Sequence, residues 1–179
     1  MKKQAIIINL AGGPGCGKSI LASDVFSALK RRFISCELSG EYIKKKLRED
    51  ARKVVQNQIY IFAKQQFQLF GMKDNVDVII TDSPIFFSSV YDESKCPHLA
   101  ALIMKEYNQY NNLTYLLKRD SEVPYEQEGR YQDRKGAELV DARVRSFMHD
   151  YSITYRELEG IGEDSLESIV SDVLIEMQK

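Results

Sequence analysis

The stretch AIIINLAGGPGCGKS, residues 5–19, carries the strongest structural signal in the sequence. Its first part, Ala5–Leu10, is almost wholly apolar and rich in β-branched residues, as in a parallel strand that is buried on both faces. The remainder, Gly12–Ser19, satisfies the pattern G-x-x-x-x-G-K-[ST] in full. An amphipathic helix is expected to follow over Ser19–Arg32. A strand, a glycine-rich loop and a helix in this order predict a P-loop that binds nucleotide phosphates.

Each part of this loop has a chemical reason. Glycines let successive backbone N–H groups point at phosphate oxygens, and the helix adds the positive end of its dipole. Lys18 is expected to reach the β- and γ-phosphates of ATP or GTP, and the Ser19 hydroxyl to bind Mg²⁺. An incidental lysine in a glycine-rich turn is the disfavoured alternative. The predicted nucleotide-binding residues are Gly12, Gly13, Pro14, Gly15, Cys16, Gly17, Lys18, Ser19, Ile20 and Arg119.

The composition of the chain limits which functions and which cellular compartment are expected. The chain has 179 residues with 25 basic and 26 acidic side chains, a formal net charge of -1. This balance argues against a general nucleic-acid or membrane binder, which usually has a large basic surplus. The three cysteines form no metal-type pair, and the N-terminal apolar run is too short for a signal peptide. We therefore expect a cytoplasmic protein with one domain over residues 1–179.

Short apolar runs alternate with helical patterns along the chain. Further strands are expected at Phe33–Leu38, Val76–Thr81, Leu113–Leu117 and Ile153–Arg156. Helices are expected at Glu41–Asp50, Val54–Phe70, Cys96–Tyr110, Ala137–Tyr151 and Ser165–Lys179. This alternation predicts a three-layer α/β fold, in which a parallel five-stranded sheet has helices on both faces. The polar segment at about 119–136 has no apolar period and is interpreted as a loop or lid.

Asp82 ends the apolar strand VDVIITD. In P-loop proteins a carboxylate at this place binds Mg²⁺, directly or through water, and can orient the nucleophile. The alternative is a helix N-cap, because Pro84 is a favoured first helical residue. The two roles are compatible. We expect Asp82 to serve as a metal ligand, together with Ser19, and as a catalytic residue.

Two groups of residues are expected on the acceptor side of the sheet. Glu41 follows the second strand, where it can accept the proton of an attacking hydroxyl; the alternative is a glutamate in a first helical turn. Glutamine side chains can read the edge of a base or a carboxamide, although ordinary helix surface is the alternative for each. The glutamines of the long helix are Gln58, Gln65, Gln66 and Gln68, and the sequence does not fix which of them face the cleft.

Three arginines lie on or beside the predicted lid: Arg119, Arg130 and Arg134. Phosphoryl transfer spreads negative charge over the transferred group, and arginines that close over it stabilise that charge and exclude water. Taken together, the three arginines are stronger evidence for a role in phosphoryl transfer than any one of them is. We expect Arg130 and Arg134 to act in catalysis, beside Lys18, Glu41 and Asp82.

The order of the motifs resembles a known family. The segments GGPGCGKS, SGEYIKKK, VIITDSPIFFSS, TYLLKRD and EGRYQDR resemble the ribosylnicotinamide kinase domain of bacterial NAD-salvage proteins, and related P-loop kinase or ATPase proteins of phages, some described as AAA-type. The similarity extends over most of the chain. It implies a nucleoside- or nucleotide-kinase-like fold, with Glu41 at the acceptor pocket, Asp82 at the strand end and Gly129-Arg130 in the lid. The sequence departs from the family's aspartate-rich pattern at residues 82–84 and 126–128.

Three hypotheses follow for the function. The favoured one is a kinase that moves the γ-phosphoryl group of ATP, with Mg²⁺, to a nucleoside, a nucleotide or nicotinamide riboside. The second is an NTPase switch with a protein partner, although residues 117–120 lack the asparagine of an N-K-x-D guanine element. The third is a phage kinase for a hydroxymethylated base in DNA, which the net charge does not favour. A membrane partner is not expected, a homodimer is left open, and a hexameric AAA motor has little room in this length.

Overall fold

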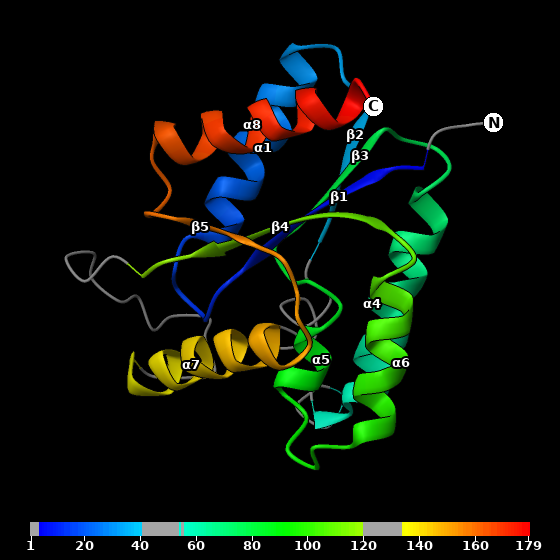
Figure 1. Ribbon diagram of the computed structural model, residues 1–179, viewed down its shortest axis with the longest axis vertical. Helices are drawn as coiled ribbons and strands as arrows, with labels where there is room; N and C mark the ends of the chain where they lie inside the picture. Colours follow the sequence, from blue (N-terminus) through cyan, green and yellow to red (C-terminus); the bar gives the residue numbers. More distant parts are fainter. Residues whose placement is uncertain (1–3, 41–53, 55, 120–133) are drawn as a thin grey trace.

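Five parallel strands form one sheet in the order β2-β3-β1-β4-β5 (Figure 1). The computed structural model describes residues 4–40, 54, 56–119 and 134–179. The strands are β1 Ile6–Ala11, β2 Cys36–Ser39, β3 Val78–Thr81, β4 Asn111–Leu117 and β5 Arg156–Leu158. The helices are α1 Lys18–Arg31, α4 Gln58–Met72, α5 Phe87–Val90, α6 Pro97–Tyr107, α7 Arg134–Asp150 and α8 Glu163–Met177. The predicted helix 41–50 lies outside the described residues.

The central strand β1 is buried on both faces, as its apolar sequence predicts. Ile6, Ile8 and Leu10 pack into one cluster with residues of α1 and α8. Ile7 and Ala11 pack into a second cluster with residues of α4, α5, α6 and α7. Since side chains of a strand alternate between the two faces, one apolar strand serves both cores. The predicted three-layer α/β fold is confirmed.

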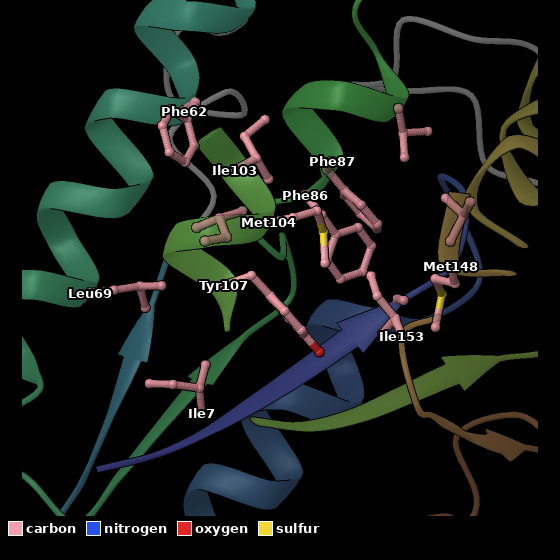
Figure 2. Close-up of a cluster of buried hydrophobic side chains, with 14 of the residues drawn as sticks. Ile7, Phe62, Leu69, Phe86, Phe87, Ile103, Met104, Tyr107, Met148 and Ile153 are labelled. Carbon is pink, nitrogen blue, oxygen red and sulfur yellow. The ribbon is translucent and has the colours of Figure 1, made fainter. Parts of the chain in front are cut away.

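The two helical layers differ in what they contain. Figure 1 shows α1 and α8 together on one face of the sheet and α4, α5, α6 and α7 on the other. At the centre of the second layer, the Phe86 ring makes T-shaped contacts with Phe87 and Tyr107 (Figure 2). The Phe86 ring also stacks on Phe147. This aromatic packing fixes the segment that follows β3, which leads away from Asp82.

Two predicted strands begin too early in the sequence, and both errors have the same cause. After α1, Phe33 adopts a left-handed conformation with φ 59, and Ile34 N–H donates back to Leu29 O at 3.1 Å. After α7, Ser152 has φ 52, and Ile153 N–H donates to Met148 O at 2.8 Å. These are Schellman helix ends, in which the apolar residue beyond the left-handed one packs back on the helix. The apolar residues resembled strand starts, but they terminate helices.

The long helix and the lid also differ from their predicted bounds. The helix α4 begins at Gln58, because the Asn57 side chain caps it by accepting a hydrogen bond from Tyr60 N–H at 3.0 Å. Ile59, although apolar, lies on the outer face of this helix and is 67% exposed. Arg134 was predicted on the lid, but it lies in α7 rather than in a loop. The short helix α5 was not predicted, because four residues carry no helical period.

The neighbouring strands β1 and β3 connect to helices on opposite faces of the sheet. β1 leads into α1 on one face of the sheet, whereas β3 leads into α5 and α6 on the other. In an open parallel sheet, ligands bind outside the carboxyl ends of strands at such a point of divergence. No helix in the part of the chain that the structure describes is long and apolar enough to span a membrane.

Candidate functional site

The loop between β1 and α1 has the backbone that an anion cradle needs. Gly12, Gly15 and Gly17 have φ values of 136, 82 and 90, a region that other residues rarely adopt. Gly17 is the N-cap of α1, and no side chain caps this helix end. The first-turn N–H groups and the positive dipole end of α1 therefore face the loop, where they suit a phosphate group.

Two neighbouring elements close tightly around this loop. A Cβ atom added to Gly13 would stand 2.6 Å from Ala137 O and 2.5 Å from an Asp141 carboxylate oxygen, so α7 touches the loop backbone. A Cβ atom added to Gly17 would collide with the side chain of Ile161, in the connection between β5 and α8. The glycines therefore permit close packing from α7 and from the β5–α8 connection as well as the backbone turn itself.

Lys18 folds back across the loop. Its Nζ donates hydrogen bonds to Gly12 O and Gly13 O, both at 2.7 Å, and lies 5.8 Å from the centre of the Phe87 ring. These partners are neutral, so they hold the ammonium group in place without cancelling its charge. An anion bound in the cradle would meet this charge.

The side chains of Ser19, at the start of α1, and Asp82, at the end of β3, are in contact. The Ser19 hydroxyl donates to an Asp82 carboxylate oxygen at 2.5 Å, and Asp82 is only 9% exposed. A hydroxyl and a carboxylate are the oxygen ligands that Mg²⁺ prefers, and Mg²⁺ usually takes its other ligands from phosphates and water. The donor set thus fits this metal ion. Within the described residues, no group of three or more His, Cys, Asp or Glu side chains offers a rival metal site.

Asp141 connects α7 to the loop, and no motif or spacing in the sequence predicts this contact. One carboxylate oxygen accepts from Gly13 N–H at 2.5 Å, and the other accepts from Arg119 Nε at 2.9 Å. Arg119 also donates to Pro14 O at 2.8 Å. Arg119 was predicted to bind the nucleotide, and the structure places it in contact with the loop through Pro14 and Asp141. Only the folded chain brings Asp141 beside Gly13, 128 positions apart.

The other predicted site residues have different surroundings. Arg134 Nε donates to Glu138 Oε1 at 3.4 Å, an exposed i,i+4 pair on α7. Ile20 points largely outward from α1, being 56% exposed, whereas Cys16 is buried in the loop. Glu41 and Arg130 lie outside the described residues. The roles predicted for these five residues stay predictions.

The structure shows which way each of the four glutamines of α4 faces. Gln58 and Gln65 lie on the buried face of α4, and Gln65 Nε2 donates to Ser83 Oγ at 2.8 Å. Gln66 turns instead towards α6, where its Nε2 donates to Glu106 at 3.2 Å. Gln68 accepts a long hydrogen bond of 3.5 Å from Ser39 Oγ. Gln65 is therefore the glutamine linked to the segment that carries Asp82.

A pocket of about 290 Å³ opens beside Arg119, at the end of β4. It is lined by Leu116, Leu117, Lys118, Arg119, Asp141 and Arg145. Its cations are paired with carboxylates: Lys118 with Glu157 at 3.2 Å and also with Glu159, and Arg145 with Glu157. The hydrogen bond from Arg145, followed by that from Lys118, lowers the pKa of Glu157. The pocket therefore offers little uncompensated positive charge.

Comparisons with known proteins agree with this geometry. A family model described as an AAA domain matches residues 7–164. Among solved structures, the NadR protein in complex with NR has a TM-score of 0.68 at 14% identity; the match covers 96% of this chain and 51% of that chain. A search of curated proteins found no match.

A second solved protein, deoxyadenosine kinase from M. mycoides, matches along almost its whole length. The structure with the products dCMP and dCDP has a TM-score of 0.56 at 17% identity, covering 94% of this chain and 98% of that chain. The structure with bound dATP gives 0.54 at 16%, with coverages of 97% and 100%. The P-loop kinase-like fold and the resemblance that the sequence motifs indicated are confirmed.

Proposed function

The chain belongs to the AAA-domain family, and from this premise we propose that it is an ATP-dependent kinase. It transfers the γ-phosphoryl group of ATP to a small nucleoside-like acceptor, with Mg²⁺ as the metal ion. The observation that carries the proposal is the pairing of Ser19 with Asp82 beside Lys18, at the carboxyl ends of β1 and β3. These are the charge and the oxygen ligands that phosphoryl transfer needs.

The acceptor class is supported by the solved structures that share the fold. The NadR structure contains NR, and the deoxyadenosine kinase structures contain dCMP and dCDP, or dATP. In this chain, the buried, hydrogen-bonded pair Gln65 and Ser83 lies next to Asp82. A nucleoside-like acceptor supplies both a hydroxyl for phosphorylation and a polar ring that suits polar groups near Asp82.

The residues divide the chemistry between them. Loop N–H groups and Lys18 hold the phosphates and stabilise the charge that develops during transfer. Ser19 and Asp82 hold Mg²⁺, which neutralises phosphate charge when bound. The acceptor oxygen bonds to the γ-phosphorus, the bond from that phosphorus to the β–γ bridging oxygen breaks, and ADP leaves. We assign the hydroxyl proton to Glu41, and assign stabilisation of the transferred group to Arg130 and Arg134, from the sequence.

A radiolabel transfer assay tests the proposal. The protein is incubated with γ-labelled ATP, Mg²⁺ and a panel of nucleosides, nucleoside monophosphates and nicotinamide riboside. We expect label on at least one acceptor. Equal ATP loss with and without every acceptor would contradict the kinase and favour the NTPase switch. Label on hydroxymethylated DNA alone would favour the third hypothesis.

The same assay with the Lys18→Ala variant tests the role of Lys18 in transfer. It removes the ammonium group that the loop carbonyls hold in place, so turnover should fall by roughly 10²–10³. Lys30→Ala is the control, because Lys30 lies at the far end of α1 beside Glu37 and the Phe26 ring. Similar rates for both variants would show that Lys18 has no part in transfer.

A further inference from the structure

We propose that Asp141 is a positioning residue for the nucleotide. It holds the guanidinium group of Arg119 against the P-loop, and Arg119 in turn neutralises the Asp141 carboxylate beside the phosphate site. The inference deepens the proposed function, because it rests on a nucleotide being bound at this loop. A closed ring of hydrogen bonds carries it, formed by the loop, the residue after β4 and the helix α7.

The ring passes through the backbone of the loop. Gly13 N–H donates to Asp141 Oδ1 at 2.5 Å, and Arg119 Nε donates to Asp141 Oδ2 at 2.9 Å. Arg119 Nη2 donates to Pro14 O at 2.8 Å and so returns to the loop one residue beyond Gly13. The side chains of Arg119 and Asp141 are 14% and 27% exposed. Each carboxylate oxygen therefore has its own donor, in a place that is only partly open to water.

The position of Asp141 requires two hydrogen-bond acceptors, because two donors meet there. A carboxylate supplies two acceptor oxygens, whereas an asparagine amide supplies one oxygen and an NH₂ group that can only donate. An asparagine at this position would have to turn its nitrogen towards Gly13 N–H or towards Arg119. In either orientation two donors face each other and one contact is lost. Asp141→Asn therefore opens the ring, although it preserves the shape of the side chain.

The charge of Asp141 is the second reason to treat it and Arg119 as a pair. A carboxylate bonded to Gly13 lies beside the loop that receives the phosphates, and like charges repel there. Arg145, one turn further along α7, pairs with Glu157 instead. Among the described residues, Arg119 is the cation bonded to Asp141. Arg119 thus offsets a negative charge that would oppose the nucleotide, so the two residues should act as a unit.

A double-mutant cycle, measured by calorimetric titration of ATP·Mg²⁺, tests this coupling. Asp141→Asn alone should raise the Kd for ATP about tenfold, the effect of one lost charge-assisted hydrogen bond. Arg119→Ala alone should raise the Kd at least as much, because the carboxylate is then left without its cation. The double variant should have a Kd within about threefold of that of Arg119→Ala, since the asparagine oxygen still accepts from Gly13 N–H and no donor opposes its nitrogen. Independent effects would instead multiply to about a hundredfold.

Kinetics in the labelled-ATP assay separate positioning from support of the fold. Asp141→Asn should raise KM for ATP, with kcat at saturating ATP within about threefold of the wild-type value. Asp150→Asn is the control, because it makes the same substitution at the exposed end of α7, where the carboxylate accepts from Ser146 Oγ. This control should leave Kd and KM unchanged. A lower Tm for Asp141→Asn with an unchanged Kd would show that the contact supports only the fold, and would overturn the proposal.

The outcomes separate the inference from the proposed function. If the wild-type protein binds ATP, but Asp141→Asn binds it equally well or the two mutations multiply, the positioning role is wrong and the kinase proposal stands. If the cycle shows the coupling but no acceptor is labelled, the positioning role stands and the kinase proposal fails. If the wild-type protein does not bind ATP, both proposals fail.

Discussion

At the scale of single residues, the proposal gives the carboxylate of Asp82 two roles, as the hydrogen-bond partner of Ser19 and as a ligand of Mg²⁺. In the structure the carboxylate accepts a hydrogen bond from the Ser19 hydroxyl, with 2.5 Å between the two oxygens, and Asp82 is nearly buried at the end of β3. When Mg²⁺ binds, the same carboxylate can neutralise part of its charge and keep the serine oxygen directed at it. An amide of equal shape preserves the contact with Ser19 but removes the negative charge.

Asp82→Asn should therefore separate metal binding from nucleotide binding. We expect the Mg²⁺ concentration for half-maximal turnover to rise by roughly tenfold or more, because charge-assisted contacts are about twice as strong as neutral ones. Affinity for ATP measured in EDTA should change little. A Mg²⁺ titration of steady-state rate is the measurement. Asp92→Asn is the control, since among the described residues the Asp92 carboxylate accepts hydrogen bonds from Ser94 and Cys96, away from Ser19. The same Mg²⁺ dependence in both variants would remove Asp82 from the metal site.

At the scale of elements, α7 and the loop are in backbone contact, and a single methyl group tests that contact. Gly13→Ala would place a Cβ atom 2.6 Å from Ala137 O, so the loop or α7 must shift and the Asp141 bond to Gly13 N–H is disturbed. We expect the Kd for ATP to rise at least about tenfold, since loop N–H groups must converge on the phosphates. Calorimetric titration of ATP·Mg²⁺ measures this change.

Gly71→Ala is the matched control for that variant. Gly71 lies in α4, and an added Cβ atom there meets nothing within 4 Å. Alanine should raise the free energy of unfolding by about 0.5–1 kcal/mol without changing the Kd for ATP. If Gly13→Ala also binds ATP normally, the loop tolerates displacement and its contact with α7 has no role in binding.

At the scale of the whole molecule, local patterns and distant contacts contributed differently to what the sequence revealed. The P-loop was predictable because strand, glycines, lysine and serine lie within fifteen consecutive residues. Ile34 and Ile153 misled the strand predictions, since an apolar residue shortly after a helix is equally compatible with the start of a strand and with a Schellman helix end. Asp141 and Gln65 could not be identified as neighbours of Gly13 and Ser83, because only tertiary packing brings those pairs together.

This dependence on packing has a thermodynamic consequence for the complete chain. The cradle takes groups from β1, α1, the end of β3 and α7, so it exists only when the chain is folded. A ligand that binds only the folded state at 100 times its Kd adds about 2.7 kcal/mol to the free energy of unfolding. For a chain of this size, that corresponds to a rise in Tm of roughly 5–10 °C.

ATP·Mg²⁺ should produce this shift in a thermal melt of the wild-type protein. Lys18→Ala should lose most of it, whereas Lys30→Ala should keep it. A wild-type Tm that does not respond to millimolar ATP·Mg²⁺ would show that the folded chain does not bind this nucleotide, and the kinase proposal would fail with it.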